Sequence, residues 1–432
     1  MQVGEAKNKG KKVGEHINKR PQHRQLFAKY ARANVQDLAP NDLPSRSAGA
    51  RRFYLTLLVA SALFYPVLDP LLFGYGTNGR LASFGDAGDY VILALGLNIV
   101  VGYAGLLDLG YVAFFAIGAY AWGLVGSTQF QVLTGITVNP QVWPWLFWPM
   151  LLVAALITAF WGVVLGVPTL RLRGDYLALV TLGFGEIIPI VFLEMDKYTN
   201  GSVGIVGVYS PNFPGVYWTP FTPLPYYYLI LALIALLIFV NIRLRDSRFG
   251  RAWIAIREDE TGAAFLGINV AHTKLLAFGA GAFFSGIAGV YHAAKLGVVT
   301  TDDFNTIDSI IFLSMVVIGG LGSIPGVIVG ALLVYFFNLL VLGQLDSFAS
   351  NPNNFLHIVP QLIPGFTFGS IRDLIFGVLL IVIMIFRPEG LIPNARRKRE
   401  LRKVEEEPVE FRPLDETPDL PEFEVEPEVP IE

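Results

Sequence analysis

Long runs of apolar residues constrain the fold of this chain more than any other feature. Eight stretches are each long enough, at about 20 mainly apolar residues, for an α-helix to cross the hydrocarbon core of a bilayer. They are 53–73, 143–167, 177–194, 226–242, 275–294, 306–322, 324–345 and 371–387. Only 16% of the residues are charged, against about a quarter in a soluble domain. The sequence therefore predicts an all-α polytopic membrane protein.

A further apolar region, 90–126, is long enough for two spans but is interrupted by Asp108 and several glycines. We interpret it as two helices, or as one helix and a re-entrant segment, because broken backbone at membrane depth is tolerated where it is buried or lines a cavity. With two crossings here, the prediction is about ten transmembrane or re-entrant helices, with both termini on the same side.

Lys and Arg residues are distributed unequally around these spans. Near the span ends, eighteen lie on the side that we assign to the cytoplasm and four on the other side, as the positive-inside rule requires. The assignment places 243–274 in the cytoplasm. An even number of spans must then precede Arg243, which favours two crossings within 90–126.

Two tails flank the predicted membrane domain, 53–387. Residues 1–52 hold twelve basic and four acidic residues and no apolar core of a signal peptide, so we expect a basic cytoplasmic tail. Residues 388–432 form a second cytoplasmic tail, with twelve acidic residues after position 403. This composition favours a solvated, unfolded segment over a docking tail. The net charge of −3 indicates no nucleic-acid binding.

Small residues recur at helical spacing within the spans. They are Gly162 with Gly166, the series Gly322, Gly326 and Gly330, and the Gly/Ala/Ser-rich segment 279–290. Such residues let helix backbones approach closely in a membrane. We expect most of them to serve helix packing.

The motifs of common enzymes are missing from the sequence. It contains no GxxxxGK[ST], HExxH or GxSxG motif and no cysteine, and its five histidines lack ligand spacing. We therefore predict no catalytic residue, no metal site and no cofactor bound by the chain itself. The chain is more suited to moving a molecule than to converting it.

Few polar groups interrupt the apolar region. Glu186 and Asp108 are carboxylates within it, and a carboxylate in hydrocarbon is a candidate functional residue because it is costly to bury there. Glu186 is equally compatible with a pathway or proton-relay role and with a structural hydrogen bond. Without a buried Lys or His beside them, two carboxylates make a poor case for proton coupling. Asn98 is a third polar group, for which an interhelical hydrogen bond is the alternative to a substrate contact.

The charged stretch 248–269, RFGRAWIAIREDETGAAFLGIN, lies between two apolar runs. Drawn as one helix, it places the following residues on one side: Trp253, Ile256, Glu260, Ala263 and Gly267. Its acidic cluster would be repelled by anionic lipid headgroups. We therefore expect this helix to dock, through a few apolar anchors and charges, in a groove of a cytoplasmic partner protein.

Several blocks of the sequence resemble one family. They are 95–120 (LGLNIVVGYAGLLDLGYVAFFAIGAY), 171–187 (RLRGDYLALVTLGFGEI), 250–268 (GRAWIAIREDETGAAFLGI), 316–326 (VVIGGLGSIPG) and 387–393 (RPEGLIP). Together, in this order, they resemble the membrane permeases of ATP-binding-cassette importers for branched-chain amino acids, specifically the longer, LivM-type permease. The resemblance covers about 90–390 and leaves out both tails.

The resemblance implies a bacterial inner-membrane location and a set of partners: a second related permease, two ATP-binding-cassette ATPases that bind the ATP, and an extracytoplasmic binding protein. It also implies that 250–268 couples the chain to an ATPase. The importer pattern Glu-Ala-Ala, three residues, Gly is altered here, because Thr261 and Gly262 separate Glu260 from the two alanines. The residues that we expect to act in coupling are Arg251, Glu258, Asp259, Glu260, Gly262, Ala263, Ala264 and Gly267. Those that we expect to line the pathway are Asn98, Gly102, Tyr103, Gly105 and Glu186.

Alternatives remain at this point. Urea and short-chain amide importers use similar permeases, and other neutral amino acids are carried by relatives. An ion-gradient-driven secondary transporter would need more charged or hydroxyl-bearing groups at the midplane. A passive channel would leave 250–268 without a role, and a structural scaffold would not explain the resemblance.

Overall fold

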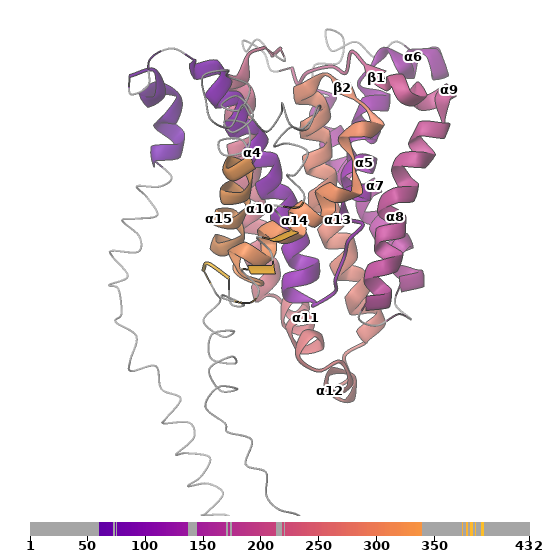
Figure 1. The fold of residues 1–432 in the computed structure, drawn as a ribbon. Coiled ribbons are helices and arrows are strands. Elements are labelled where there is room, and N and C mark those ends of the chain that lie inside the picture. The colour runs from indigo at the N-terminus through magenta and orange to yellow at the C-terminus, as the bar shows by residue number, and fades with distance from the viewer. Residues whose placement is uncertain are drawn as a thin grey trace, which may run out of the picture. The chain divides into compact units, whose positions relative to one another are not determined.

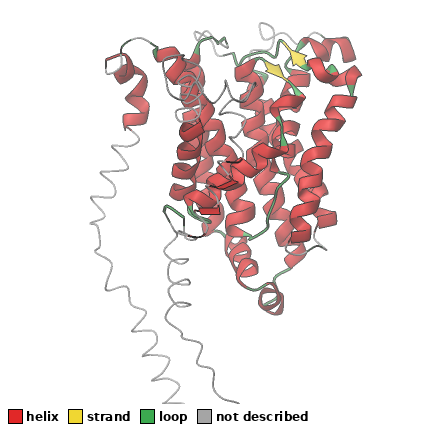
Figure 2. Ribbon diagram, in the orientation of Figure 1, coloured by secondary structure: helices red, strands yellow, loops and turns green. Residues whose placement is uncertain are grey.

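The computed structural model describes residues 60–71, 74, 76–136, 145–169, 172, 175–212, 218, 219, 221–338 and scattered positions between 374 and 392. These residues are predominantly helical, with one short two-stranded sheet (Figure 2). The predicted all-α class is confirmed. Residues 60–71 of the predicted span 53–73 are helical. The tail 1–52, most of the tail 388–432 and most of the span 371–387 lie outside the described residues, so the domain boundaries and the count of ten remain predictions.

Two long helices form the buried centre of the bundle. Helix α4 (Thr77–Leu97) continues without interruption into the π-helical segment η1 (Asn98–Tyr103), and α13 spans Val270–Leu296. Each unit has 27 residues, which corresponds to about 40 Å at 1.5 Å per residue. In an apolar stretch of 18 residues within each unit, 83% and 72% of the residues are buried. The two long helices therefore bury much more of their surface than a lipid-facing helix does.

Three further spanning helices are peripheral. They are α7 (Phe147–Thr169), α8 (Asp175–Glu194) and α10 (Pro223–Asp246). Their apolar windows are only 28%, 22% and 33% buried. Large apolar side chains such as Phe160, Leu179 and Phe239 are exposed on them, as expected for helices in contact with lipid or with another membrane protein.

Region 90–126 contains a descending helix and a broken return. We expected the descending helix to begin near residue 90, but it begins at Thr77. Residues 104–110 then form an irregular segment, and α5 (Tyr111–Val125) leads back toward the starting end (Figure 1). Helix α6 (Thr128–Thr134) follows at a bend of 71°. The chain thus turns back once, and its return is a half-length helix preceded by irregular backbone.

The predicted span 306–322 is shorter in the structure, and the span 324–345 is described only as far as residue 338. Helix α14 covers Thr306–Gly319 and α15 covers Ile324–Phe336. At 1.5 Å per residue, α14 is about 20 Å long, less than the ~30 Å hydrocarbon core. The prediction of a full-length helix was wrong for 306–322, because Gly320 and Gly322 adopt positive φ angles of 118° and 78° that end α14. Gly322 therefore lies outside the helix that holds Gly326 and Gly330.

Glycines set the spacing between the central helices. Gly118 of α5 faces Gly286 of α13, and a Cβ on Gly118 would lie 2.6 Å from the Gly286 Cα. Gly162 of α7 faces Ala282 of α13 in the same way. The predicted packing role of small residues is confirmed for 279–290 and for Gly162.

The remaining elements lie at one end of the bundle or in the loop between α10 and α13. The first group is α9 (Asp196–Thr199), η2 (Gly201–Val203), β1 (Ile205–Val206), β2 (Val298–Val299) and η3 (Thr301–Asp303). Strands β1 and β2 pair antiparallel, with Ile205 opposite Val299. Helices α11 (Arg248–Glu258) and α12 (Glu260–Phe265) project at the other end (Figure 1). Among the described residues, five helices are long and apolar enough to span a membrane, or six if the bent α5–α6 pair is counted as one span.

Candidate coupling and translocation site

The charged stretch 248–269 forms two helices, not the single helix that we predicted. The break is at Asp259, whose backbone is extended and whose side chain accepts a hydrogen bond from the N–H of Thr261 at 2.9 Å. The backbone N–H groups of Gly262 and Thr261 hold the pKa of this carboxyl below its usual range. Asp259 is therefore the N-cap of α12. Our prediction of one helix considered only the spacing of apolar residues and so did not identify this capping residue.

The apolar face of this pair is buried within the chain. Trp253, Ile256 and Ala263 are 1%, 5% and 3% exposed, and the Trp253 Nε1–H donates to the Thr273 carbonyl at 2.8 Å. We expected Trp253 and Ile256 to lie on the partner-facing side. Trp253 instead joins α11 to the start of α13.

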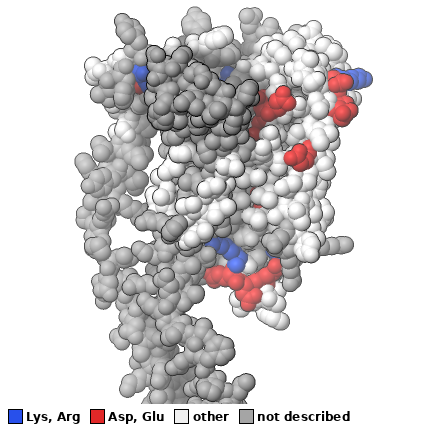
Figure 3. Space-filling view, in the orientation of Figure 1, with Lys and Arg blue, Asp and Glu red and all other residues white. Residues whose placement is uncertain are grey.

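A different set of residues is exposed at the tip. Phe265 and Leu266 are 90% and 82% exposed, and Glu258 and Asp259 are exposed beside them. Figure 3 shows acidic side chains gathered at this end of the molecule, next to a small basic group. The sequence signal for this tip is the adjacent apolar pair Phe265 and Leu266 in a polar loop. We did not identify it because we treated 248–269 as one helix.

The remaining predicted coupling residues have different environments. Arg251, Ala264 and Gly267 are exposed, and Ala263 is buried. Gly262 is half-buried against the Asp259 carboxylate. Their proposed contact with an ATPase remains a prediction.

Glu260 is paired inside the chain. Its Oε2 lies 2.9 Å from the Nζ of Lys274, a buried residue in the first turns of α13. The pair therefore holds α12 against α13, in addition to the contact through Trp253. Glu260 thus acts within the chain, whatever it contributes at the outer surface of the tip.

Reversing the charge of Glu260 is expected to weaken transport, and reversing both charges of the pair is expected to restore it. Glu260→Lys places two ammonium groups together at a site where Lys274 is buried, which costs more than at a solvated surface. Glu260→Lys combined with Lys274→Glu restores the attraction. Substrate uptake by the assembled complex measures the effect. If the double variant were no more active than Glu260→Lys alone, the ion pair would not be the basis of the defect.

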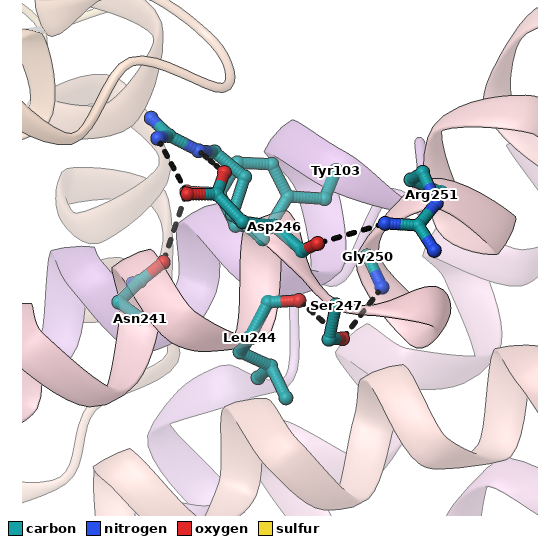
Figure 4. Close-up of polar contacts among 8 residues, drawn as sticks. Tyr103, Asn241, Leu244, Asp246, Ser247, Gly250 and Arg251 are labelled. Atoms are coloured by element: carbon teal, nitrogen blue, oxygen red, sulfur yellow. Dashed lines mark hydrogen bonds and ion pairs between the residues drawn. The ribbon is translucent and has the colours of Figure 1, made fainter.

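Ser247 caps the start of α11 at its junction with α10. Its hydroxyl accepts from the N–H of Gly250 at 3.3 Å (Figure 4) and from the N–H of Phe249 at 3.2 Å. Arg251 donates from Nη1 to the Asp246 carbonyl at 2.9 Å. These contacts fix the direction in which α11 leaves α10. Arg251 is exposed, but it also has a structural role at the junction.

Three of the predicted pathway residues, Asn98, Gly102 and Tyr103, lie in η1, which contacts α11. Tyr103 donates its hydroxyl hydrogen to the Asn241 Oδ1 at 2.9 Å (Figure 4), and Asn241 donates to the Leu95 carbonyl at 3.2 Å. Asn98 is fully buried, and its Oδ1 accepts from the N–H of Gly322 at 2.9 Å. Tyr103 thus bonds to helix α10, whereas Asn98 bonds to the turn between α14 and α15. Their contact with substrate remains a prediction.

Arg257 connects α11 with this cluster, and it was missing from our predicted site. Its guanidinium donates from Nη1 to the Gly102 carbonyl. Gly105 (φ 71°) leaves room for its aliphatic part, because a Cβ there would lie 2.7 Å from the Arg257 Cγ. Its Nη1 also lies close to Gly322. A side chain of the candidate coupling helix thus enters between two irregular segments of the bundle, 104–110 and 320–323.

Glu186 lies apart from this cluster. It is an exposed residue on α8, so the structure does not bring it together with Asn98, Gly102, Tyr103 and Gly105. Asp108 is buried in the irregular segment after η1, where its Oδ1 accepts from the N–H of Gly110 at 2.9 Å. Asp108 therefore has a local structural role at the start of α5.

An ionic cluster that we did not predict lies between α4 and α13. Lys295 forms an ion pair with Asp86, and the His292 Nδ1 lies 3.3 Å from the Asp89 Oδ2. Asp89 and Lys295 are buried. We did not predict this cluster, because we began the helix near residue 90 and so placed Asp86 and Asp89 outside it. The cluster ties the far end of α13 to α4.

Helices of membrane-spanning length, two half-length helices and a projecting helix pair define a polytopic membrane transport protein. Residues 80–384 match the family described as the permease component of branched-chain amino acid transport systems. The chain belongs to this family of membrane permeases.

Individual relatives agree with the family match. The chain is 37% identical to the high-affinity branched-chain amino acid transport system permease proteins LivM of Escherichia coli K12 and of Salmonella typhimurium, over 72% of this chain and 70% of each relative. It is 24% identical to LivH of E. coli K12, a permease protein of the same kind of system, over 70% of this chain and 91% of LivH. No solved structure matches the chain.

Proposed function

We propose that this permease imports branched-chain or other neutral hydrophobic amino acids as one of two permeases in an ATP-driven complex. The observation that carries the proposal is the family match over residues 80–384, joined to 37% identity with LivM. The chain has no phosphate-binding motif of its own. ATP is therefore bound by two partner ATPases, and an extracytoplasmic binding protein delivers the substrate.

The projecting pair α11–α12 is the docking element for an ATPase in this proposal. Phe265 and Leu266 provide apolar anchors, and Glu258 and Asp259 provide charges that set the register in a groove. Closure of the ATPases displaces the pair, and the contacts of Trp253, Glu260 and Arg257 convey the displacement to α13 and η1. ATP must supply the difference in stability between the two access states, because substrate binding alone cannot drive uphill transport.

This orientation places α11 and α12 in the cytoplasm of a bacterial cell, together with both termini. The excess of Lys and Arg near that side of the predicted spans supports it. The binding protein then meets the opposite end, where β1, β2 and α6 lie.

Uptake into vesicles that contain the whole complex tests the proposal. Radiolabelled leucine and urea are offered separately, once with ATP on the ATPase side and once with an imposed ion gradient and no ATP. We expect accumulation of leucine with ATP alone. Accumulation of urea instead of leucine would replace the substrate and keep the mechanism, whereas uptake driven only by the ion gradient would refute ATP coupling.

A further inference from the structure

Helix α8 exposes a carboxylate near the middle of an apolar span. Glu186 is exposed, eleven positions after Asp175 and eight before Glu194, the two ends of the helix. At 1.5 Å per residue, it lies roughly 12 Å or more from either end. Within the described part of the chain, no ion pair or hydrogen bond is found for its carboxylate. A charged group at this depth is costly in lipid and is found facing protein or a water-filled cavity.

The other two peripheral helices provide a contrast. The interior of α7 carries no charged residue, and the charges of α10 are confined to its last turn. A groove of ≈ 600 Å³ between α7, α10, α11 and α13 is lined by apolar side chains, including Leu156, Phe160 and Phe283. These surfaces need only acyl chains as neighbours. Of the three peripheral helices, α8 is therefore the one whose exposed face is mismatched with lipid.

Helix α8 also adds backbone polarity at the same depth. Pro189 has no N–H, so the Gly185 carbonyl, four residues earlier, lacks its usual helical donor. Glu186 follows Gly185 directly. A carboxylate and a carbonyl without its helical partner thus lie one residue apart in the middle of the span.

The opposite side of α8 contacts the broken part of the bundle. Its Thr181 Oγ1 accepts from the N–H of Leu109 at 3.0 Å. A Cβ on Gly185 would lie 3.1 Å from the Gly110 Cα and 3.5 Å from the Thr306 Oγ1. Helix α8 therefore separates the starts of the two half-length helices, α5 and α14, from whatever covers Glu186.

We propose that the exposed face of α8 around Glu186 is the contact surface for the second permease, and that the partner supplies a hydrogen-bond donor or water-lined wall to this carboxylate. A protein fits this surface better than lipid does, because the Glu186 carboxylate needs a hydrogen-bond donor at mid-membrane depth and acyl chains have none. A second related permease is the partner that the family implies, since LivM and LivH are both permease proteins of such systems and are similar to this chain over 72% and 70% of its length. The inference rests on the proposed function only in requiring that second permease.

Photo-cross-linking in the assembled complex tests the surface directly. Benzoylphenylalanine is placed at Ile187 and Ile190 on the α8 face, which are 53% and 52% exposed, and at Leu236 and Phe239 of α10, both 55% exposed, as matched controls. We expect the two α8 positions to cross-link to the second permease, identified by mass spectrometry, and the two α10 positions not to. Absence of a protein adduct at α8, an adduct with a second copy of this chain, or equal adducts from α10 would overturn the proposal.

Variants that remove the Glu186 carboxylate give a second measurement. Glu186→Leu is expected to leave the amount of chain in the membrane unchanged and to reduce the recovery of the partner permease with it by about tenfold, whereas Glu186→Gln retains most of the recovery. The control Leu236→Glu, at the middle of α10, should instead lower the amount of chain in the membrane. Unchanged partner recovery in Glu186→Leu would contradict the proposal.

The two levels of the proposal fail separately. ATP-dependent leucine uptake by the unmodified complex reports on the proposed function. Cross-links and partner recovery report on the α8 surface and do not require transport.

Discussion

Replacing Arg257 by alanine is expected to reduce ATP-driven uptake about 10- to 100-fold while the chain remains folded and assembled. The guanidinium is the charged donor to the Gly102 carbonyl and extends from α11 into the bundle. A hydrogen bond to a charged group contributes about 1.5–3 kcal/mol, and each 1.4 kcal/mol is a factor of ten in an equilibrium. Removing the bond from one access state shifts the balance between states by that factor.

The measurement pairs uptake with ATP hydrolysis by the same vesicles. Arg257→Ala should hydrolyse ATP while accumulating much less substrate, because the ATPases still close but η1 no longer follows α11. Arg248→Ala is the matched control, since Arg248 lies on the same helix, is exposed and stacks on Phe249 at 5.0 Å. If Arg257→Ala transported as well as Arg248→Ala, the connection between α11 and η1 would not carry the motion.

Replacing Gly118 by alanine is expected to destabilise the bundle by about 3 kcal/mol, toward the upper end of the cost of overpacking. The new Cβ would lie 2.6 Å from both the Cα and the O of Gly286. A side-chain neighbour could rotate away, but here the neighbour is backbone. Gly286 cannot retreat, because a Cβ on it would already lie 2.9 Å from the Ala155 Cα of α7. Helix α13 is held between α5 and α7.

Thermal unfolding in detergent measures this effect, with Gly79→Ala as the control. Gly79 also lies within a helix, α4, but has no atom within 4 Å of its ideal Cβ position. We expect Gly79→Ala to be as stable as the parent chain and Gly118→Ala to unfold at a distinctly lower temperature. Equal melting temperatures would show that α5 and α13 can separate without cost.

The sequence predicts the class of fold well because spanning helices are determined by local composition. The predicted spans 226–242 and 275–294 correspond to α10 and α13, and each helix extends a few residues beyond the apolar run. The start of α4 was harder to predict, since Asp86 and Asp89 resemble loop residues until their partners on α13 are known. Ion pairs that neutralise such residues join positions about 200 apart in the chain, and composition within a window does not reveal them.

The candidate site was predictable in part for the same reason. Residues 248–269 stand out as a charged segment between apolar runs, and Asn98 through Gly105 as a polar, glycine-rich break. What joins the two is Arg257, and no local pattern distinguishes it from the other arginines of the segment. The break at Asp259 could have been inferred from its capping chemistry, and it determines which apolar residues remain exposed.

The attachment of α13 at both ends makes this helix a lever. One end is bound to α11 and α12 through Thr273 and Lys274, and the other to α4 through His292 and Lys295. Its middle is narrow, because Gly281 and Gly286 let neighbouring helices come close. In the proposed mechanism, α11 and α12 displace one end of a rod of about 40 Å, and tilting about its glycine-rich middle moves the end that carries the ion pairs with α4 in the opposite direction.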